Sequence, residues 1–197
     1  MKLIGLTGGI GMGKSTSADL LSRRGIPVVD TDVLAREMVE PGQPALADVV
    51  AAFGNEVLAG DGTLQRGVLA RKVFSNETLR KQLEGILHPR IRERWRSQVE
   101  RWKEEGRRGG VVVIPLLFET GAESLFEAVV CTACSPSSQR ERLLKRGWSE
   151  QESERRKQAQ WPVEKKMSHS RFVVWTEGSL EVHAAQWQRI LTFLDLP

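Results

Sequence analysis

Short apolar runs recur along the chain and predict β-strands. The most apolar of them, at residues 111–114, is Val-Val-Val-Ile, which is typical of a central parallel strand buried on both faces. The five runs that predict strands cover residues 2–7, 26–29, 111–114, 128–134 and 171–175. Helical patterns separate these runs. The sequence therefore predicts an α/β fold in which helices cover both faces of one five-stranded parallel sheet, a three-layer α/β/α arrangement.

Apolar residues spaced three and four apart predict the helices. The longest such pattern consists of Leu79, Leu83, Ile86, Leu87, Ile91, Trp95, Val99 and Trp102. Pro89 lies within this pattern and is expected to kink or restart the helix, and residues 75–77 are expected to cap it. The other predicted helices cover residues 17–24, 33–39, 44–53, 66–74, 136–146, 150–159 and 180–194, with a loop at 55–62.

A glycine-rich stretch lies between the first predicted strand and the first predicted helix. Residues 8–16 are Gly-Gly-Ile-Gly-Met-Gly-Lys-Ser-Thr, which fit the phosphate-loop pattern of Gly, four residues, then Gly-Lys-Ser/Thr. Glycines let several backbone N–H groups point at one spot, and the helix N-terminus adds partial positive charge. Lys14 is expected to reach the outer phosphates, and the Ser15 hydroxyl to bind Mg²⁺. A glycine-rich turn with a chance lysine is the alternative, but the flanking elements favour a site for a nucleoside triphosphate.

Two carboxylates follow the second strand, in the segment Asp30-Thr31-Asp32. Ligands of open α/β sheets bind at the carboxyl ends of the strands, so this segment and the phosphate loop are expected on the same rim. Asp32 is predicted to accept a proton from an acceptor hydroxyl. It is also a suitable N-cap for the helix at 33–39, and the alternative is that both carboxylates only cap and turn the chain.

The third predicted strand ends without an acidic residue. Many ATPases and GTPases carry the magnesium-binding Asp at this place, whereas this chain has Pro115. An acid for the metal would have to come from Asp30, Asp32 or Glu119. The chain also has no Asn-Lys-x-Asp segment of the kind that recognises guanine. Both features count against a motor or switch NTPase.

A basic helical hairpin is predicted after the fourth strand. Arg142 and Arg146 are one helical turn apart on one face, and Arg140 precedes them. A lid that brings arginines onto a transferring phosphoryl group has this form, and the alternative is a solvated pair of charged helices. The predicted parts are a core at 1–32, 107–138 and 168–197, a helical acceptor-binding region at 33–106, and a lid at 139–167.

Composition narrows the class of protein only a little. The 197 residues are 40% hydrophobic and 27% charged, which suits one globular domain. No apolar run is long enough to cross a bilayer, and the chain starts with a strand and a motif rather than a signal peptide, so we expect a cytoplasmic protein without membrane contact. The net charge of +4 fits a small polyanionic substrate as well as nucleic acid. Trp95 and Trp102 share the apolar helix face, which favours core packing over stacking on bases.

The only two cysteines, Cys131 and Cys134, form a C-x-x-C sequence within a predicted strand. No second ligand pair accompanies them, and residues three apart on a strand face opposite sides of the sheet. We therefore expect buried free thiols of a cytosolic protein, not a zinc or redox site.

Several motifs, taken in order, resemble those of the dephospho-CoA kinases, a family of P-loop kinases. They are the phosphate loop at 5–15, Asp30-Thr31-Asp32, Asp61-Gly62-Thr63-Leu64-Gln65-Arg66, His88-Pro89, the segment 115–119, and lid residues Gln139, Arg140, Arg142, Arg146, Arg156 and Gln160. The resemblance covers nearly the whole chain and implies a nucleoside-monophosphate-kinase-like fold. It also implies ATP-dependent phosphorylation of the ribose 3′-hydroxyl of dephospho-CoA, the last step of coenzyme A synthesis.

The resemblance also implies roles for particular residues. The catalytic residues would be Asp32, Lys14 and Arg142. The ATP site would consist of Gly11, Met12, Gly13, Lys14, Ser15, Thr16, Arg142 and Arg146, with Mg²⁺ on Ser15. The acceptor site would consist of Asp32, Leu64, Arg66, His88, Leu117 and Glu119. The expected partners are ATP and dephospho-CoA, without nucleic acid, and the expected state is a monomer or small homo-oligomer.

The chain departs from the family pattern near its end. Thr176-Glu177-Gly178 stands where the family has Asn-x-Gly, and Ser170-Arg171 stands where Ala-Asp is usual. The family Asn belongs to the loop near the adenine of ATP, so the resemblance leaves base recognition at Thr176 open. Two other functions also stay open: a P-loop kinase for a nucleoside or shikimate-like acceptor, and a basic P-loop protein that binds nucleic acid.

Overall fold

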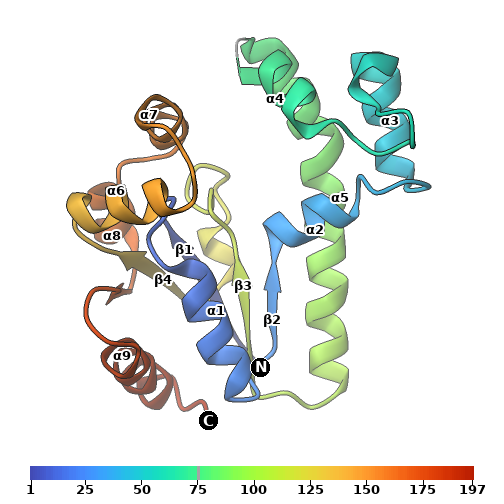
Figure 1. The fold of residues 1–197 in the computed structure, drawn as a ribbon. Coiled ribbons are helices and arrows are strands. Elements are labelled where there is room, and N and C mark those ends of the chain that lie inside the picture. Colours follow the sequence, from blue (N-terminus) through green and yellow to red (C-terminus); the bar gives the residue numbers. More distant parts are fainter. Residues whose placement is uncertain (75) are drawn as a thin grey trace. The chain divides into compact units, whose positions relative to one another are not determined.

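The computed structural model describes residues 1–74 and 76–197 and contains one parallel sheet (Figure 1). Its strands are β1 (Lys2–Gly8), β2 (Val28–Asp30), β3 (Gly109–Val113), β4 (Ala128–Ala133) and β5 (Phe172–Trp175). They pair in the order β2-β3-β1-β4-β5, and every pair is parallel. The predicted five-stranded parallel sheet is confirmed, with strand ends within two residues of those expected.

Helices connect the strands. They are α1 (Lys14–Arg23), α2 (Thr31–Glu37), α3 (Pro44–Phe53), α4 (Arg66–Phe74), α5 (Glu77–Glu104), α6 (Pro136–Lys145), α7 (Glu150–Gln158), α8 (Val163–His169) and α9 (Leu180–Phe193). Short 3₁₀ turns lie at Asn55–Val57, within the predicted loop, and at Glu123–Leu125. Helix α8 was not predicted from the sequence. Its start signals are nevertheless present, because Pro162 precedes it and Glu164 lies in its first turn.

The chain folds into two compact units. One consists of Met1–Asp30 and Glu100–Pro197 and contains the sheet, and the other consists of Thr31–Val99. The long helix α5 belongs to both, since its last turn lies in the sheet unit.

Side chains alternate along the strands of the sheet unit and form two packed layers. Ile4, Leu6, Val111 and Val130 point to one face, where they pack with Leu21 of α1 and with Trp187, Ile190 and Leu191 of α9. On the other face, a Cβ on Gly5 would lie 2.7 Å from Leu117, and one on Gly110 would lie 2.6 Å from Trp102 of α5. Helix α8 also contacts β1 and β4 there, between the sheet and solvent. Helices therefore cover both faces, as predicted.

The helical unit has a core of its own. Its buried residues come mainly from α3, α4 and the turn after α3, and they are Val39, Leu46, Val49, Phe53, Val57, Leu69 and Val73. The first half of α5 packs against this core through Leu79, Leu83, Ile86 and Leu87. These four residues belong to the spacing pattern that predicted the helix.

Pro89 does not interrupt α5, which runs from Glu77 to Glu104. The expected restart of the helix is therefore wrong. A proline inside a helix lacks one N–H and displaces the carbonyls of the preceding turn. The missing N–H leaves the carbonyl of Gly85 without its helical donor. The neighbouring carbonyl of Ile86 accepts from Arg90 Nη1 at 2.7 Å. The predicted cap residue Ser75 lies outside the described residues, but Asn76 Oδ1 accepts from the N–H of Leu79 at 3.1 Å and caps the helix.

Asp32 is not the N-cap of α2. The helix begins at Thr31, directly after Asp30 ends β2, so Asp32 lies inside the first turn. The chain passes from strand to helix without the turn that a capping role would need. A carboxylate in the first turn still interacts favourably with the positive end of the helix dipole.

Both cysteines are buried and free, as expected. Burial raises the pKa of the Cys131 thiol to about 11, so this thiol is an inert core group at neutral pH. Trp95 and Trp102 are each 5% exposed, which confirms that they pack in the interior. Within 1–74 and 76–197, no helix is both long and apolar enough to span a bilayer.

Candidate functional site: a phosphate loop beside an arginine-lined pocket

The glycine-rich stretch connects the carboxyl end of β1 to the first turn of α1. Gly13 is the N-cap of α1, with φ 85° and ψ 15°, and Gly11 also has a positive φ of 74°. Lys14, Ser15 and Thr16 open the helix, and Ser15 and Thr16 are exposed. The first N–H groups of a helix have no intrahelical partner, and together with the helix dipole they make an anion site. The geometry of a phosphate loop is therefore present.

Two glycines of the loop are required by close contacts as well as by backbone angles. A Cβ on Gly8 would lie 2.4 Å from the carbonyl oxygen of Thr132 on β4. A Cβ on Gly13 would lie 2.9 Å from Cγ2 of Thr176, which follows β5. The loop is thus packed against the ends of the neighbouring strands.

Lys14 folds back over its own loop. Its Nζ donates to the carbonyl oxygens of Gly8 at 2.8 Å and of Gly9 at 3.0 Å. The ammonium group is therefore held at the concave side of the loop, where the outer phosphates of a bound nucleotide would lie.

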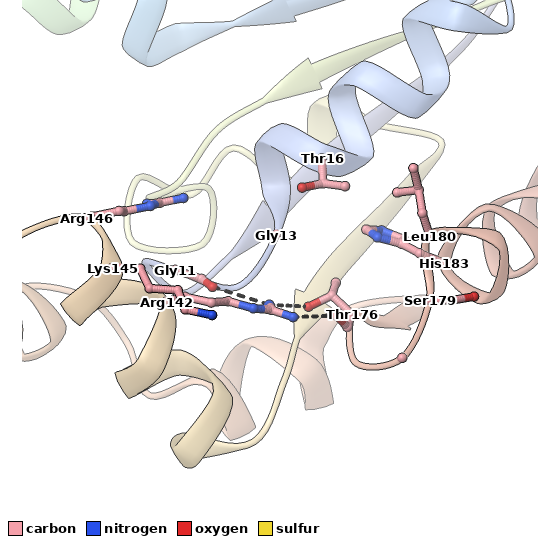
Figure 2. Close-up of a pocket in the computed structure, with 11 residues that line it drawn as sticks. Gly11, Gly13, Thr16, Arg142, Lys145, Arg146, Thr176, Ser179, Leu180 and His183 are labelled. Atoms are coloured by element: carbon pink, nitrogen blue, oxygen red, sulfur yellow. Dashed lines mark hydrogen bonds between the residues drawn. The ribbon is translucent and has the colours of Figure 1, made fainter.

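A pocket of about 520 Å³ lies beside the loop (Figure 2). It is lined by Gly11, Gly13, Thr16, Arg142, Lys145, Arg146, Thr176, Gly178, Ser179, Leu180 and His183. These residues come from the loop and first turn of α1, from α6, and from the segment between β5 and α9. The structure thus brings Arg142 and Arg146 together with Gly11, Gly13 and Thr16 of the predicted ATP site.

The side chain of Arg142 is hydrogen-bonded both to the phosphate loop and to Thr176, which follows β5. Its Nη1 donates to Thr176 Oγ1 at 2.8 Å and to the carbonyl of Gly11 at 3.4 Å, and its Nη2 donates to the carbonyl of Thr176 at 2.5 Å (Figure 2). In the part of the chain that the structure describes, no carboxylate forms an ion pair with Arg142. Its charge is therefore available to an anion in the pocket.

Arg140 and Arg156 have other surroundings. Arg140 pairs with Glu150 across the start of α7, and it does not line the pocket. Arg156 lies over the ring of Trp148, 4.3 Å from its centroid, and pairs with Glu152 at 2.9 Å. The structure thus separates these two arginines from Arg142 and Arg146, which line the pocket.

Thr176, which departs from the family pattern, is used to hold the site together. It is 7% exposed, and its hydroxyl accepts from Arg142 and lies 3.2 Å from the Ala133 carbonyl and 3.4 Å from the Met12 carbonyl. In the sequence, this residue stands out only as a departure from the family pattern. No motif marks a threonine at a strand end as a partner of an arginine in another segment.

His183 is a pocket residue that the sequence analysis missed. It is 4% exposed, and its Nε2 is 2.8 Å from the hydroxyl of buried Ser17 on α1. Burial lowers the pKa of His183, so the neutral ring is the form held against the pocket. His183 lies four residues after Ser179, the N-cap of α9, and no sequence motif at that position predicts a pocket residue.

Asp30 and Asp32 lie at the end of the edge strand β2. Asp30 is in register with Val113 of β3, so it stands at the carboxyl ends of the strands. Asp32 follows two residues later, in the helical unit. Both residues take part in interactions within the structure, and the proton-accepting role of Asp32 stays a prediction.

Glu119 and Leu117, both predicted to bind the acceptor, are engaged inside the protein. Leu117 is fully buried in a cluster with Phe118, Ala122 and Val129. Glu119 Oε1 accepts from the N–H of Trp161 at 2.7 Å and pairs with Lys166 at 2.8 Å. Glu119 Oε2 is buried without a partner in the described part of the chain.

The predicted acceptor residues of the helical unit lie in separate elements. Leu64 pairs with Leu58 in an isolated antiparallel bridge, and Arg66 begins α4 and donates to the carbonyl of Arg36 at 3.1 Å. His88 is exposed on α5. Asp61 turns the chain before Leu64: its Oδ1 accepts from the N–H and the hydroxyl of Thr63, which lowers the pKa of Asp61. Their acceptor-binding roles stay predictions.

The site fits a magnesium ion that is held mainly by phosphates. No group of three or more His, Cys, Asp and Glu side chains gathers within the described residues. Mg²⁺ in nucleotide sites keeps several waters and needs only one or two protein oxygens beside the phosphates. The exposed Ser15 hydroxyl in the first turn of α1 fits as one of them.

Comparisons with known proteins agree with the geometry of the site. A sequence model of the dephospho-CoA kinase family matches residues 2–181. The chain is 45% identical over 195 residues to a dephospho-CoA kinase of Anaeromyxobacter dehalogenans, covering 98% of this chain and 92% of that protein. It is 44% identical over 190 residues to a dephospho-CoA kinase of Bacillus anthracis, covering 96% of this chain and 95% of that protein.

A solved structure extends the similarity to the fold. The crystal structure of TT1252 from Thermus thermophilus matches with a TM-score of 0.86 and 34% identity, covering 98% of this chain and 97% of that one. The likeness thus holds for sequence and fold over nearly the whole length. The chain belongs to the dephospho-CoA kinase family.

Proposed function

We propose that this protein transfers the γ-phosphoryl group of ATP to the ribose 3′-hydroxyl of dephospho-CoA, which gives coenzyme A and ADP. The observation that carries the proposal is the 45% identity to a dephospho-CoA kinase over 98% of the chain. The phosphate loop and the pocket beside it support the nucleotide half of this reaction. The reaction would be the final step of coenzyme A synthesis.

The phosphate loop holds the donor in this proposal. Backbone N–H groups at the start of α1 bind the phosphate oxygens, and Lys14 neutralises charge on the outer phosphates. Ser15 would contribute one oxygen to Mg²⁺, which when bound would offset the negative charge of the phosphates. The exposure of Ser15 and the position of Lys14 over the loop support these roles.

Arg142 and Arg146 stabilise the group in transfer. In phosphoryl transfer, negative charge spreads over the oxygens of the transferring group, and fixed cations lower the barrier. Arg142 is already oriented by Thr176 and Gly11, so little reorganisation would precede reaction. Its lack of a carboxylate partner in the described structure supports the role.

Asp32 accepts the proton of the attacking hydroxyl in this proposal. It follows the end of β2, and the carboxyl ends of the strands are where ligands of such sheets bind. Leu64, Arg66, His88, Leu117 and Glu119 are proposed to bind dephospho-CoA.

We also infer a cytoplasmic protein that works as a monomer or small homo-oligomer, without nucleic acid or membrane as a partner. Two free buried thiols support a reducing compartment. The burial of Trp95 and Trp102 removes them as stacking platforms for bases.

An acceptor panel tests the function. ATP consumption is measured with dephospho-CoA, with adenosine or shikimate, and with single-stranded DNA as the added partner. Turnover that depends on dephospho-CoA is expected. Turnover with adenosine or shikimate alone would assign a different acceptor, and stimulation by DNA alone would favour the nucleic-acid function.

A further inference from the structure

Two glutamines hold opposite sides of one residue of the phosphate loop. Gln139 Nε2 donates to the carbonyl oxygen of Ile10 at 2.7 Å, and the N–H of Ile10 donates to Gln160 Oε1 at 3.2 Å. Gln139 lies on α6 and is 6% exposed, while Gln160 lies two residues after the end of α7. Gln139 and Gln160 are thus the two ends of the segment 139–160, called the hairpin below, which contains most of α6, all of α7, and both Arg142 and Arg146.

The end of this hairpin is also fixed to the segment that follows β3. Trp161, next to Gln160, donates its N–H to Glu119 Oε1 at 2.7 Å, and its ring stacks on Phe118 with centroids 6.0 Å apart. Fully buried Lys166 holds Glu119 at 2.8 Å and donates to the Pro115 carbonyl at 2.6 Å. Gln160 therefore contacts the loop from a rigid position.

Ile10 needs such support because of its neighbours. Gly9 and Gly11 flank it, and glycine tolerates backbone conformations on both sides of φ = 0. The N–H and the carbonyl of Ile10 belong to the two peptide units on either side of it, and rotation of either unit would change which backbone groups the loop presents to an anion. The two glutamines oppose this rotation, since each hydrogen bond fixes one of the backbone groups of Ile10.

We propose that Gln139 and Gln160 are positioning residues that couple the conformation of the phosphate loop to the arginine-bearing hairpin at 139–160. The inference rests on the proposed use of the loop as a triphosphate site. When the loop closes around phosphates, the hairpin is held in the position that brings Arg142 and Arg146 to the transferring group. When the loop conformation changes, the hydrogen bonds that hold the hairpin at Gln139 and Gln160 change with it.

Volume-conserving substitutions test the proposal. Gln139→Met and Gln160→Met each remove one hydrogen bond to Ile10, whereas Gln158→Met makes the same change at an exposed position of α7. The first two are expected to lower kcat by about 3- to 10-fold each, the scale of one neutral hydrogen bond, while Gln158→Met keeps kcat. The double variant is expected to lose less than the product of the single losses, because both side chains act on one residue.

Hydrogen exchange separates coupling from a merely structural role. A non-hydrolysable ATP analogue is expected to protect residues 8–13 and the hairpin at 139–160 together in the unsubstituted protein. In Gln139→Met and Gln160→Met, the loop should still gain protection but the hairpin should gain much less. Gln160 is less buried than Gln139, so Gln160→Met alone decides the matter if the Gln139 variant fails to fold.

The inference is overturned if both variants keep full nucleotide-dependent protection of the hairpin and the kcat of Gln158→Met. Failure of the proposed function has a different result. The unsubstituted protein would then not turn over dephospho-CoA, yet the analogue would still protect loop and hairpin together.

Discussion

Arg142 binds a threonine hydroxyl and two backbone carbonyls, all of them neutral. Neutral acceptors orient a guanidinium group without cancelling its charge. A carboxylate in the place of Thr176 would hold the arginine more strongly, but it would also repel the phosphates. At the scale of single residues, the site combines fixed geometry with unbalanced positive charge.

Arg142→Ala is expected to lower kcat by about 100-fold, the scale seen when one fixed donor to a transition state is lost, with little change in melting temperature. Arg140→Ala is the matched control, because Arg140 lies on the same helix and pairs with Glu150 outside the pocket. Steady-state kinetics and thermal unfolding of both variants give the comparison. A large fall in melting temperature with Arg142→Ala would instead indicate a structural arginine.

Alanine substitutions at Gly13 and Gly25 distinguish two destabilising effects of an added methyl group, which are backbone strain and overpacking. Both have a left-handed φ, 85° and 78°, but a Cβ on Gly25 meets nothing within 4 Å, whereas one on Gly13 meets Thr176. Gly25→Ala is expected to lower the free energy of unfolding by about 1–2 kcal/mol from backbone strain alone. Gly13→Ala should cost about 1–3 kcal/mol more from overpacking. Urea unfolding measures both, and equal losses would contradict the contact with Thr176.

At the scale of elements, Glu177 connects the segment after β5 to the start of α6. Its Oε1 accepts from the N–H of Ser135 at 2.8 Å and from the Ser135 hydroxyl, and its Oε2 accepts from Trp175 Nε1 at 3.1 Å. Hydrogen bonds, chiefly those from Ser135 and Ser138, lower the pKa of Glu177 to about 2. The ionised carboxylate thus supports the N-terminus of the helix that carries Arg142.

The lowered pKa of Glu177 predicts a pH dependence of stability. A carboxylate with a depressed pKa stabilises the fold above its unfolded value of 4.5 and loses that contribution as the pH falls toward 2. Glu177→Gln should therefore be less stable than the unsubstituted protein at pH 7, and the difference should shrink between pH 4.5 and 2. Thermal unfolding across this range checks it. A difference that stays constant down to pH 2 would show that the ionised form is not favoured by the fold.

Helix α8 is attached to the segment after β3 through a buried ion pair. Lys166→Met leaves the Glu119 carboxylate without its cation, and losing one partner of a buried pair costs about 3–5 kcal/mol. The double variant Lys166→Met/Glu119→Gln should recover part of this loss, because a neutral amide still accepts from Trp161 and needs no counter-ion. Chemical unfolding of the single and double variants provides the test. Additive losses would mean that the two groups do not interact.

At the scale of the whole molecule, the elements followed from local patterns. The run at 111–114 and the spacing from Leu79 to Trp102 depend on which residues are neighbours in sequence, and the sheet and α5 followed from them. Helix α8 was missed because it is short and its buried Lys166 breaks the apolar pattern that identifies a helix face. The restart at Pro89 was wrong because α5 continues through the proline, although the missing N–H costs one helical hydrogen bond.

The site was predictable only in part, for a related reason. The phosphate loop, Arg142 and Arg146 carry sequence motifs, and the structure places them around one pocket. Thr176, His183 and the Gln139 contact to Ile10 depend on segments that meet only after folding. Their side chains have no fixed spacing from the motif, so a sequence pattern could not find them.

In the proposed reaction, the phosphoryl group of ATP reaches the ribose 3′-hydroxyl of dephospho-CoA with Asp32 as the proton acceptor. NMR of the product from a single turnover, run with the unsubstituted protein and with Asp32→Asn, tests it most directly. We expect phosphorus coupled to the ribose 3′ proton, and a rate lowered by about 100-fold or more in Asp32→Asn with ATP binding nearly intact. A phosphate at any other position, or no transfer to dephospho-CoA by the unsubstituted protein, would contradict it.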